Sequence, residues 1–169
     1  YKLAFAEHDD LFVGGASSNF PEGDRSLWRC IWSSSVPQKM KKMAWKTVSG
    51  ALATNQCKSY RHLPVRSSCP MCTLEVETSF HALVTCNHAA VLWDLMRRIW
   101  PLPGHDLLIN TGRDWLLSLL SSCNGTVRDM IMMLIWRIWS LRSDLVHRKE
   151  VASPQVSSDY LQTYMQSLG

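Results

Sequence analysis

The stretch CPMCTLEVETSFHALVTC, residues 69–86, decides the fold of this 169-residue chain. It places Cys69, Cys72, His81 and Cys86 at the spacing C-x2-C-x8-H-x4-C. Three thiolates and one imidazole suit a tetrahedral zinc ion, and the two-residue gap lets the first two thiolates reach one metal from a tight turn. Because four protein ligands leave no open coordination position, the pattern predicts one structural, non-catalytic zinc site.

Cysteines in this pattern allow two interpretations other than a zinc site. A redox Cys-x-x-Cys motif belongs to a βαβ context, which the sequence does not show. Cysteine is also common in hydrophobic cores, and that is the role expected for Cys30, Cys57 and Cys123. The identity of the histidine ligand rests on spacing, since His62 and His88 lie close to it in sequence.

The composition of the whole chain indicates an ordered protein of a reducing compartment. With 169 residues, 46% of them hydrophobic, the chain can bury one core or two small ones and is too apolar to be disordered. It starts at Tyr1 without a signal-peptide pattern, so we expect a fragment or a processed chain. The longest apolar run, residues 130–136, is far too short to span a bilayer. Six cysteines that fit a metal set plus free thiols favour an intracellular location, the nucleus or the cytoplasm.

The net charge of +4 hides a strong asymmetry along the chain. Residues 1–24 carry one basic and five acidic groups, and residues 73–169 carry eight basic and nine acidic groups. Residues 25–72, in contrast, carry nine basic groups and no acidic group. A block of one sign that leads into a metal site is the electrostatic pattern expected of a chain that meets a polyanion.

The apolar periodicity predicts a mostly α fold, a small zinc-stapled helical domain with a helical C-terminal extension. Helices are expected over residues 24–32, 38–52, 77–85, 88–100, 113–121, 127–149 and 153–168. Residues 55–66 are expected to form a loop, and residues 11–13 are the only short strand-like patch. We therefore expect three parts: an irregular acidic lead-in (1–24), a zinc-binding helical domain (25–103) and a helical extension that packs on it (104–169).

One face of the predicted helix 38–52 carries lysines at steps of three and four residues. Like charges so close together repel each other mildly, which a bound polyanion would relieve, but a plain solvated face explains the lysines equally well. An aromatic side chain near cations suits the stacking of bases, although Trp45 also suits a core position. The candidate nucleic-acid-binding residues are Lys39, Lys42, Lys46, Lys58, Arg61, Arg66 and Trp45.

Several short segments occur in an order that is typical of one family. They are Trp28-Arg29-Cys30-Ile31-Trp32, Val36-Pro37-Gln38-Lys39, Ala44-Trp45-Lys46, Leu52-Ala53-Thr54, the Cys-x-x-Cys pair with Glu77 and His81, and then Cys86 and Trp93. Over about residues 26–100 the chain resembles the zinc-binding domain that follows reverse transcriptase in plant LINE-type (non-LTR) retrotransposons. Residues 135–142 resemble the helix between that domain and a ribonuclease H domain. The resemblance implies the same four zinc ligands as the spacing does.

Three positions depart from the family pattern. The family usually has Pro where Ala53 stands, Gly where Thr73 stands and Asn where Ser143 stands. Such changes are typical of drift after retrotransposition is lost, or of recruitment to another role. We therefore expect a domesticated fragment of such an element.

The sequence lacks the motifs of a polymerase, a nuclease and other common catalytic sites. It shows no polymerase aspartate motif, no carboxylate set for two-metal nuclease chemistry, no Ser-His-Asp or Cys-His arrangement and no phosphate-binding glycine loop. We therefore predict that the chain is not an enzyme. The leading hypothesis is a zinc module that binds RNA or single-stranded DNA, which in the parent element would hold template or target near the polymerase.

A second hypothesis is a protein-interaction module, such as an inhibitor, an antidote or an assembly partner. Eight Trp and eight Met in 169 residues favour adhesive and adaptable surfaces. The C-terminal helices lie outside the zinc motif and carry no basic excess, so they would form the interface.

Overall fold

The computed structural model describes residues 23–168, and the regular elements in that range are all helices. The prediction of a mostly α fold is therefore confirmed. The expected acidic lead-in (1–24) and the strand-like patch at 11–13 fall wholly or almost wholly outside the described residues. In chain order the helices are α2 (Gly23–Trp32), α3 (Gln38–Val48), α4 (Asn55–Tyr60), the π-helix η1 (His81–Thr85), α5 (Asn87–Arg97), the 3₁₀ turn η2 (His105–Leu107), α6 (Trp115–Ser121), α7 (Gly125–Val146) and α8 (Pro154–Leu168).

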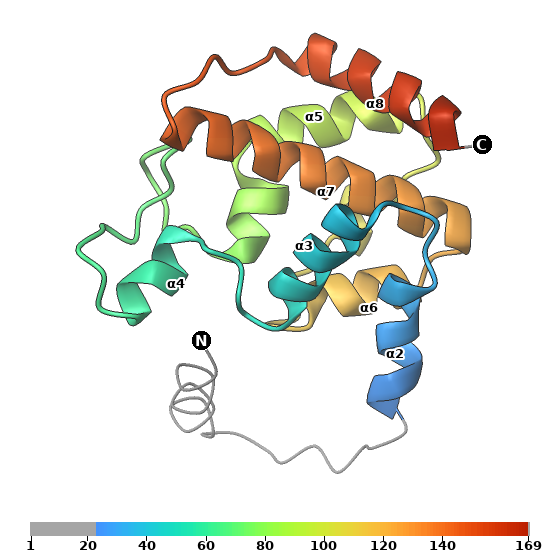
Figure 1. Ribbon diagram of the computed structural model, residues 1–169, viewed down its shortest axis with the longest axis horizontal. Helices are drawn as coiled ribbons and strands as arrows, with labels where there is room; N and C mark the ends of the chain where they lie inside the picture. Colours follow the sequence, from blue (N-terminus) through green and yellow to red (C-terminus); the bar gives the residue numbers. More distant parts are fainter. Residues whose placement is uncertain (1–22, 169) are drawn as a thin grey trace.

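Helix α7 is the central element of the fold, and α3, η1, α5 and α8 pack against it. It crosses the middle of the molecule, with α5 and α8 on one side and α3 and α6 on the other (Figure 1). Residues 131–135 are five consecutive residues with almost no exposed surface. Five residues in a row cover every side of a helix, so α7 is enclosed all round at this level and must be apolar there. Leu145, near the end of α7, is 39% exposed.

One continuous core joins the two expected parts of the chain. Helix α2 contacts α6, α3 contacts both α6 and α7, and α5 contacts α8. The core cluster includes Met40 and Trp93 from the first part as well as Leu116, Ile131 and Leu161 from the second. The described residues of 25–103 and 104–169 thus contribute to the same core. The domain boundary at residue 103 stays a prediction.

Two of the differences between the predicted and the observed helices have local reasons. Residues 55–60 were expected to be a loop but form α4, whose first turn is capped by Thr54 accepting a hydrogen bond from the Cys57 N–H. This short helix buries no residue, so it has no apolar stripe by which to predict it. Helix α3 ends at Val48 and not at Leu52, because Gly50 takes a φ of 70° that turns the chain out of the helix.

No helix in the described range is long and apolar enough to cross a membrane.

Candidate metal centre

The structure brings Cys69, Cys72, His81 and Cys86 together in one cluster. One ligand atom from each residue lies within 4.8 Å of the ligand atoms of the other three. Cys69 and Cys86 are buried and Cys72 is partly buried. Among the described residues this is the group whose donor atoms converge in a way that fits a metal ion.

The distances within the cluster fit a tetrahedral zinc ion. The sulfur atoms of Cys69 and Cys86 lie 3.7 Å apart, and the Cys72 sulfur lies 3.4 Å from Nε2 of His81. Zn–S bonds of about 2.3 Å and a Zn–N bond of about 2.0–2.1 Å give tetrahedral edges of about 3.8 Å between sulfurs and about 3.5 Å between sulfur and nitrogen. Three thiolates and an imidazole in this geometry are a donor set for structural zinc, with no position left for a substrate.

A tight turn places the first two cysteines. The Cys69 N–H donates to the Glu75 carbonyl over 2.7 Å, and the Thr73 N–H donates to the Cys69 carbonyl over 2.8 Å. An isolated antiparallel bridge between Ser68 and Val76 closes the turn behind them. Thr73 has a φ of 62°, a left-handed conformation that favours glycine. This explains why the resembled family usually has glycine at this position.

A π-helical turn places the other two ligands. The Cys86 N–H donates to the His81 carbonyl five residues earlier, over 2.8 Å. Residues 81–84 are buried where η1 packs against α5 and α7. The sequence predicted an ordinary helix over 77–85, and the wider turn differs because it must bring both His81 and Cys86 to one point. Such π-turns are frequent at functional sites.

A second layer of contacts orients the His81 ring. Its Nδ1 lies 3.1 Å from a carboxylate oxygen of Glu75 and 3.3 Å from the Thr85 hydroxyl. An acceptor on Nδ1 leaves Nε2 as the nitrogen that faces Cys72, which is how carboxylates usually orient metal-binding histidines. Sequence reasoning missed Glu75. Its only signal is an acidic residue inside the loop between the ligands.

The three thiols of the cluster have different pKa values. Burial and hydrogen bonding oppose each other at Cys72, where backbone N–H groups of Glu75 and Leu74 and the His81 ring outweigh desolvation and lower the pKa to about 6. Burial raises the pKa of Cys69. Burial, together with the nearby Cys69 thiol, raises the pKa of Cys86 to about 12. Without a cation only one thiolate is favoured, and a bound Zn²⁺ would stabilise all three.

The competing histidines lie outside the cluster. His62 is exposed in the turn after α4. His88 lies in the first turn of α5, where both of its ring nitrogens are buried without a hydrogen-bond partner in the described part of the chain. Burial, followed by the neighbouring His81, lowers the pKa of His88 to about 4, so its imidazole is neutral at physiological pH. The structure groups His81 with the three cysteines, as the spacing suggested.

A buried ion pair ties the metal segment to the central helix. Arg142 of α7 donates from Nε to one oxygen of Glu77 over 2.7 Å and from Nη2 to the other over 2.8 Å. The exposed fractions of the two residues are 4% and 0%. The Asn55 backbone N–H also donates to Glu77, and its side-chain amide donates to the Ser68 carbonyl. The first residue of α4, the metal turn and α7 are thereby held together.

Most of the candidate nucleic-acid-binding residues are exposed, but one of them, Lys39, also lies over aromatic rings of the C-terminal helices. Lys42, Lys46, Arg61 and Arg66 are exposed, and Lys58 and Trp45 are partly buried. The exposed Lys39 places its Nζ 4.2 Å from the centre of the Trp136 ring on α7 and 5.6 Å from that of Tyr164 on α8. Lys39 therefore has a cation–π partner in the C-terminal helices.

Comparison with known proteins shows what the segment that carries the cluster is similar to. Residues 16–93 match the family model described as zinc-binding in reverse transcriptase. This segment is similar to the reverse-transcriptase zinc-binding family. The resemblance to a reverse-transcriptase zinc-binding domain is thereby confirmed, and the matched range contains all four residues of the cluster.

Two relatives are similar to part of the chain. One is the transposon TX1 uncharacterized 149 kDa protein of Xenopus laevis, 35% identical over 79 residues, which are 47% of this chain and 6% of that protein. The other is a putative ribonuclease H protein of Arabidopsis thaliana, 29% identical over 68 residues, 40% of this chain and 11% of that protein. The chain thus corresponds to a small part of each relative. No solved structure matches the chain.

Proposed function

We propose that this chain is a non-enzymatic zinc module that binds single-stranded RNA or DNA, with one zinc ion held by Cys69, Cys72, His81 and Cys86. The observation that carries the proposal is the run of nine basic and no acidic side chains over residues 25–72, which leads directly into the metal cluster. We call residues 39–66, which hold the six candidate cations, the basic segment. Its cations would neutralise phosphates without reading sequence.

The packing supports a structural role for the zinc in this function. The metal turn carries Glu77, which accepts a hydrogen bond from the first residue of α4, and α4 carries Lys58. A zinc ion that holds residues 69–86 in place would therefore also hold part of the basic segment in place. The zinc ion would then serve binding by holding the protein in shape, and no reaction at the metal is needed.

The relatives suggest where such a module would act. One relative is named as a transposon protein and the other as a putative ribonuclease H protein. A module between a polymerase and a nuclease that handle the same strand would serve both by holding that strand. Origin from a plant element and domestication both stay predictions, and the relatives come from a frog and a plant.

A binding titration tests the proposal. Zinc-loaded protein is titrated with labelled single-stranded RNA at about 50 mM and about 200 mM salt, and several phosphate contacts should weaken binding at least tenfold between the two. The double variant Lys42→Gln/Lys46→Gln should bind more weakly, and its salt slope should fall by about 1.4, or about 0.7 for each lost contact with a single strand. The matched control Arg148→Gln/Lys149→Gln removes the same charge from the exposed segment that follows α7. Absence of binding at low salt, or equal loss in both variants, would overturn the proposal.

The exposed side of α8 favours a second candidate function, a docking site for a protein. Val156, Tyr160 and Leu168 are 56%, 37% and 38% exposed, and the Tyr160 ring stacks on Tyr164 with 5.8 Å between centroids. Aromatic side chains on one helix face are typical anchors of protein interfaces. If the chain fails to bind nucleic acid, a concentration series in analytical ultracentrifugation tests this face first, with Tyr160→Ala as the variant that should abolish any self-association.

A further inference from the structure

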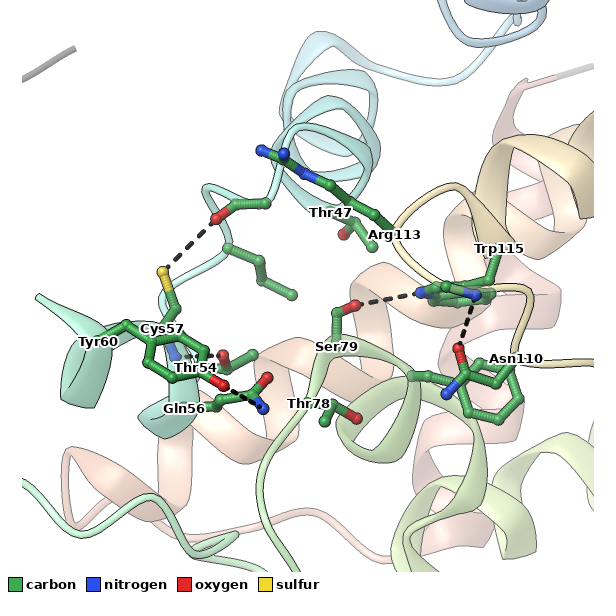
Figure 2. A pocket seen from close by; sticks show the side chains of 14 residues that line it. Thr47, Thr54, Gln56, Cys57, Tyr60, Thr78, Ser79, Asn110, Arg113 and Trp115 are labelled. Atoms are coloured by element: carbon green, nitrogen blue, oxygen red, sulfur yellow. Dashed lines mark hydrogen bonds between the residues drawn. The ribbon is translucent and has the colours of Figure 1, made fainter. Parts of the chain in front are cut away.

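A pocket lies beside the metal centre, between the end of α3, helix α4 and the loop before α6. Its volume is about 380 Å³, near the small end of the range of about 300–1,000 Å³ that is usual for ligand sites. Figure 2 shows Tyr60 and Cys57 on the α4 side, Trp115 on the opposite side, and Thr78 and Ser79 on the segment between them. Thr78 and Ser79 lie just before His81, the zinc-ligand candidate at the start of η1.

The walls of the pocket are held by hydrogen bonds that do not need a ligand. Arg113 Nη2 donates to the Ser49 carbonyl over 2.7 Å and so closes the end of α3. Trp115 Nε1 donates to the Ser79 hydroxyl over 3.1 Å, and Phe80 packs edge-on against the Trp115 ring at 5.2 Å between centroids. Helix α4 is fixed by its Thr54 cap. A pocket built in this way is pre-organised, so a ligand does not have to order it.

The chemistry of the lining suits a nucleobase. None of the 14 lining residues is acidic, and Arg113 supplies a cation at the rim. Tyr60 is 61% exposed, and the amide of Gln56 lies 3.4 Å from its hydroxyl. An exposed aromatic ring with an amide beside it offers a stacking surface and both a donor and an acceptor for a base edge.

From this arrangement we infer that the pocket receives one unstacked base of a single-stranded nucleic acid, with the adjoining phosphate near Arg113. The inference rests on the proposed function, and it adds a site that separates single strands from duplexes. Two walls of the pocket come from residues 47–60, inside the block that carries nine basic groups and no acidic one. The charge around the pocket therefore complements a polyanion. A paired base in a duplex is stacked within the helix and cannot enter.

A variant series tests the role of the Tyr60 ring. Tyr60→Ala should weaken the binding of a short single-stranded RNA by about five- to a hundredfold, the range that base–aromatic stacking gives, and should leave binding of a duplex of equal length unchanged. Tyr60→Phe keeps the ring and should keep the affinity. Val91→Ala removes an exposed apolar side chain from α5, far in sequence from the basic segment, and is the control that should bind both ligands normally.

The thiol of Cys57 provides a second readout in the unmodified sequence. Cys57 lines the pocket and is partly buried, and Cys123 is a similarly buried thiol in the turn between α6 and α7. In zinc-loaded protein, saturating single-stranded RNA should slow the alkylation of Cys57 at least threefold and leave Cys123 unchanged, measured by peptide mass spectrometry. A saturating duplex should protect neither thiol.

The outcomes separate this inference from the proposed function. If single strands bind in a salt-dependent way but Cys57 keeps its rate and Tyr60→Ala keeps its affinity, the pocket inference is wrong and the basic segment alone explains binding. An equal effect of Tyr60→Ala on duplex and single strand would also overturn it. If neither ligand binds at low salt, the proposed function fails and the inference fails with it.

Discussion

Thr73 shows how a single residue departs from the pattern of its family at a physical cost. It lies directly after Cys72 with a φ of 62°, where a β-branched residue is strained and glycine is not. Its hydroxyl donates to the Cys72 carbonyl over 2.7 Å, which offsets part of that cost. The turn keeps its shape because the metal-ligand pair and its backbone hydrogen bonds determine it.

Replacement of Thr73 by glycine should therefore stabilise the zinc-loaded protein. We expect a gain of about 1 kcal/mol in the free energy of unfolding. A left-handed conformation costs a residue with a Cβ about 1–2 kcal/mol, and the greater conformational entropy of glycine in the unfolded chain offsets part of the gain. Urea denaturation measures the difference. Thr73→Ala also lacks the hydroxyl but keeps a Cβ, so it should show no gain. An equal or larger gain for alanine would show that the left-handed backbone is not the cause.

The histidine of the cluster can be identified by metal content. His81→Ala should lose most of the bound zinc, because Nε2 of His81 is the nitrogen that lies with the three sulfurs and three ligands leave the site open to solvent. His88→Ala should keep about one zinc per chain, since its ring lies outside the cluster. Inductively coupled plasma mass spectrometry of both purified variants gives the ratio. Retention of zinc by His81→Ala would assign the fourth ligand elsewhere.

At the scale of elements, the metal segment and α7 depend on one buried ion pair. Glu77 and Arg142 lie 65 residues apart and meet in a bidentate contact. Both residues lie in segments that resemble the family, but nothing in the local pattern links them. Periodicity predicted most helices because each has an apolar face. It missed α4, which buries no residue, and it missed the π-turn, whose width depends on a metal ligand at each end.

Removal of one partner of this pair should destabilise the fold strongly. Arg142→Met leaves the Glu77 carboxylate buried and unpaired, which costs about 3–5 kcal/mol. The double variant Glu77→Gln/Arg142→Met should recover a large part, because the neutral amide can still accept the Asn55 hydrogen bond. Urea denaturation in the presence of zinc measures both.

Arg98→Met serves as the control for that series. Arg98 is exposed at the end of α5, so its replacement should change stability by no more than about 0.5 kcal/mol. If Arg142→Met behaves like Arg98→Met, the buried ion pair does not hold the metal segment to α7.

At the scale of the whole molecule, the chain has two sources of stability that meet at Glu77. One is the hydrophobic core around α7, to which most of the described helices contribute. The other is the metal cluster, which holds residues 67–78, a stretch without a helix whose side chains are mostly exposed or only partly buried. A core of this size should survive without metal, whereas the turn should not.

Removal of zinc should therefore loosen one region before the others. We expect a chelator to lower the melting temperature by at least about 10 °C, since structural zinc contributes several kcal/mol to folding. Hydrogen exchange should accelerate in residues 67–86 and in α4, while the middle of α7 stays protected. Restored zinc should reverse both effects. Uniform acceleration along the whole chain would show that the core depends on the metal.

The sequence by itself determined the helical class, most helix positions and the four members of the cluster, because each depends on residues close together in the chain. Helical periodicity repeats within a few residues, and a zinc site assembled from one turn and one helix is encoded in local spacing. Only the tertiary structure decided that α7 is enclosed on several sides, that Glu75 orients His81 and Glu77 meets Arg142, that Lys39 lies over Trp136, and that a pocket opens beside the metal centre. Those features arise where distant segments pack against one another, and a contact between distant residues leaves no periodic trace in the chain.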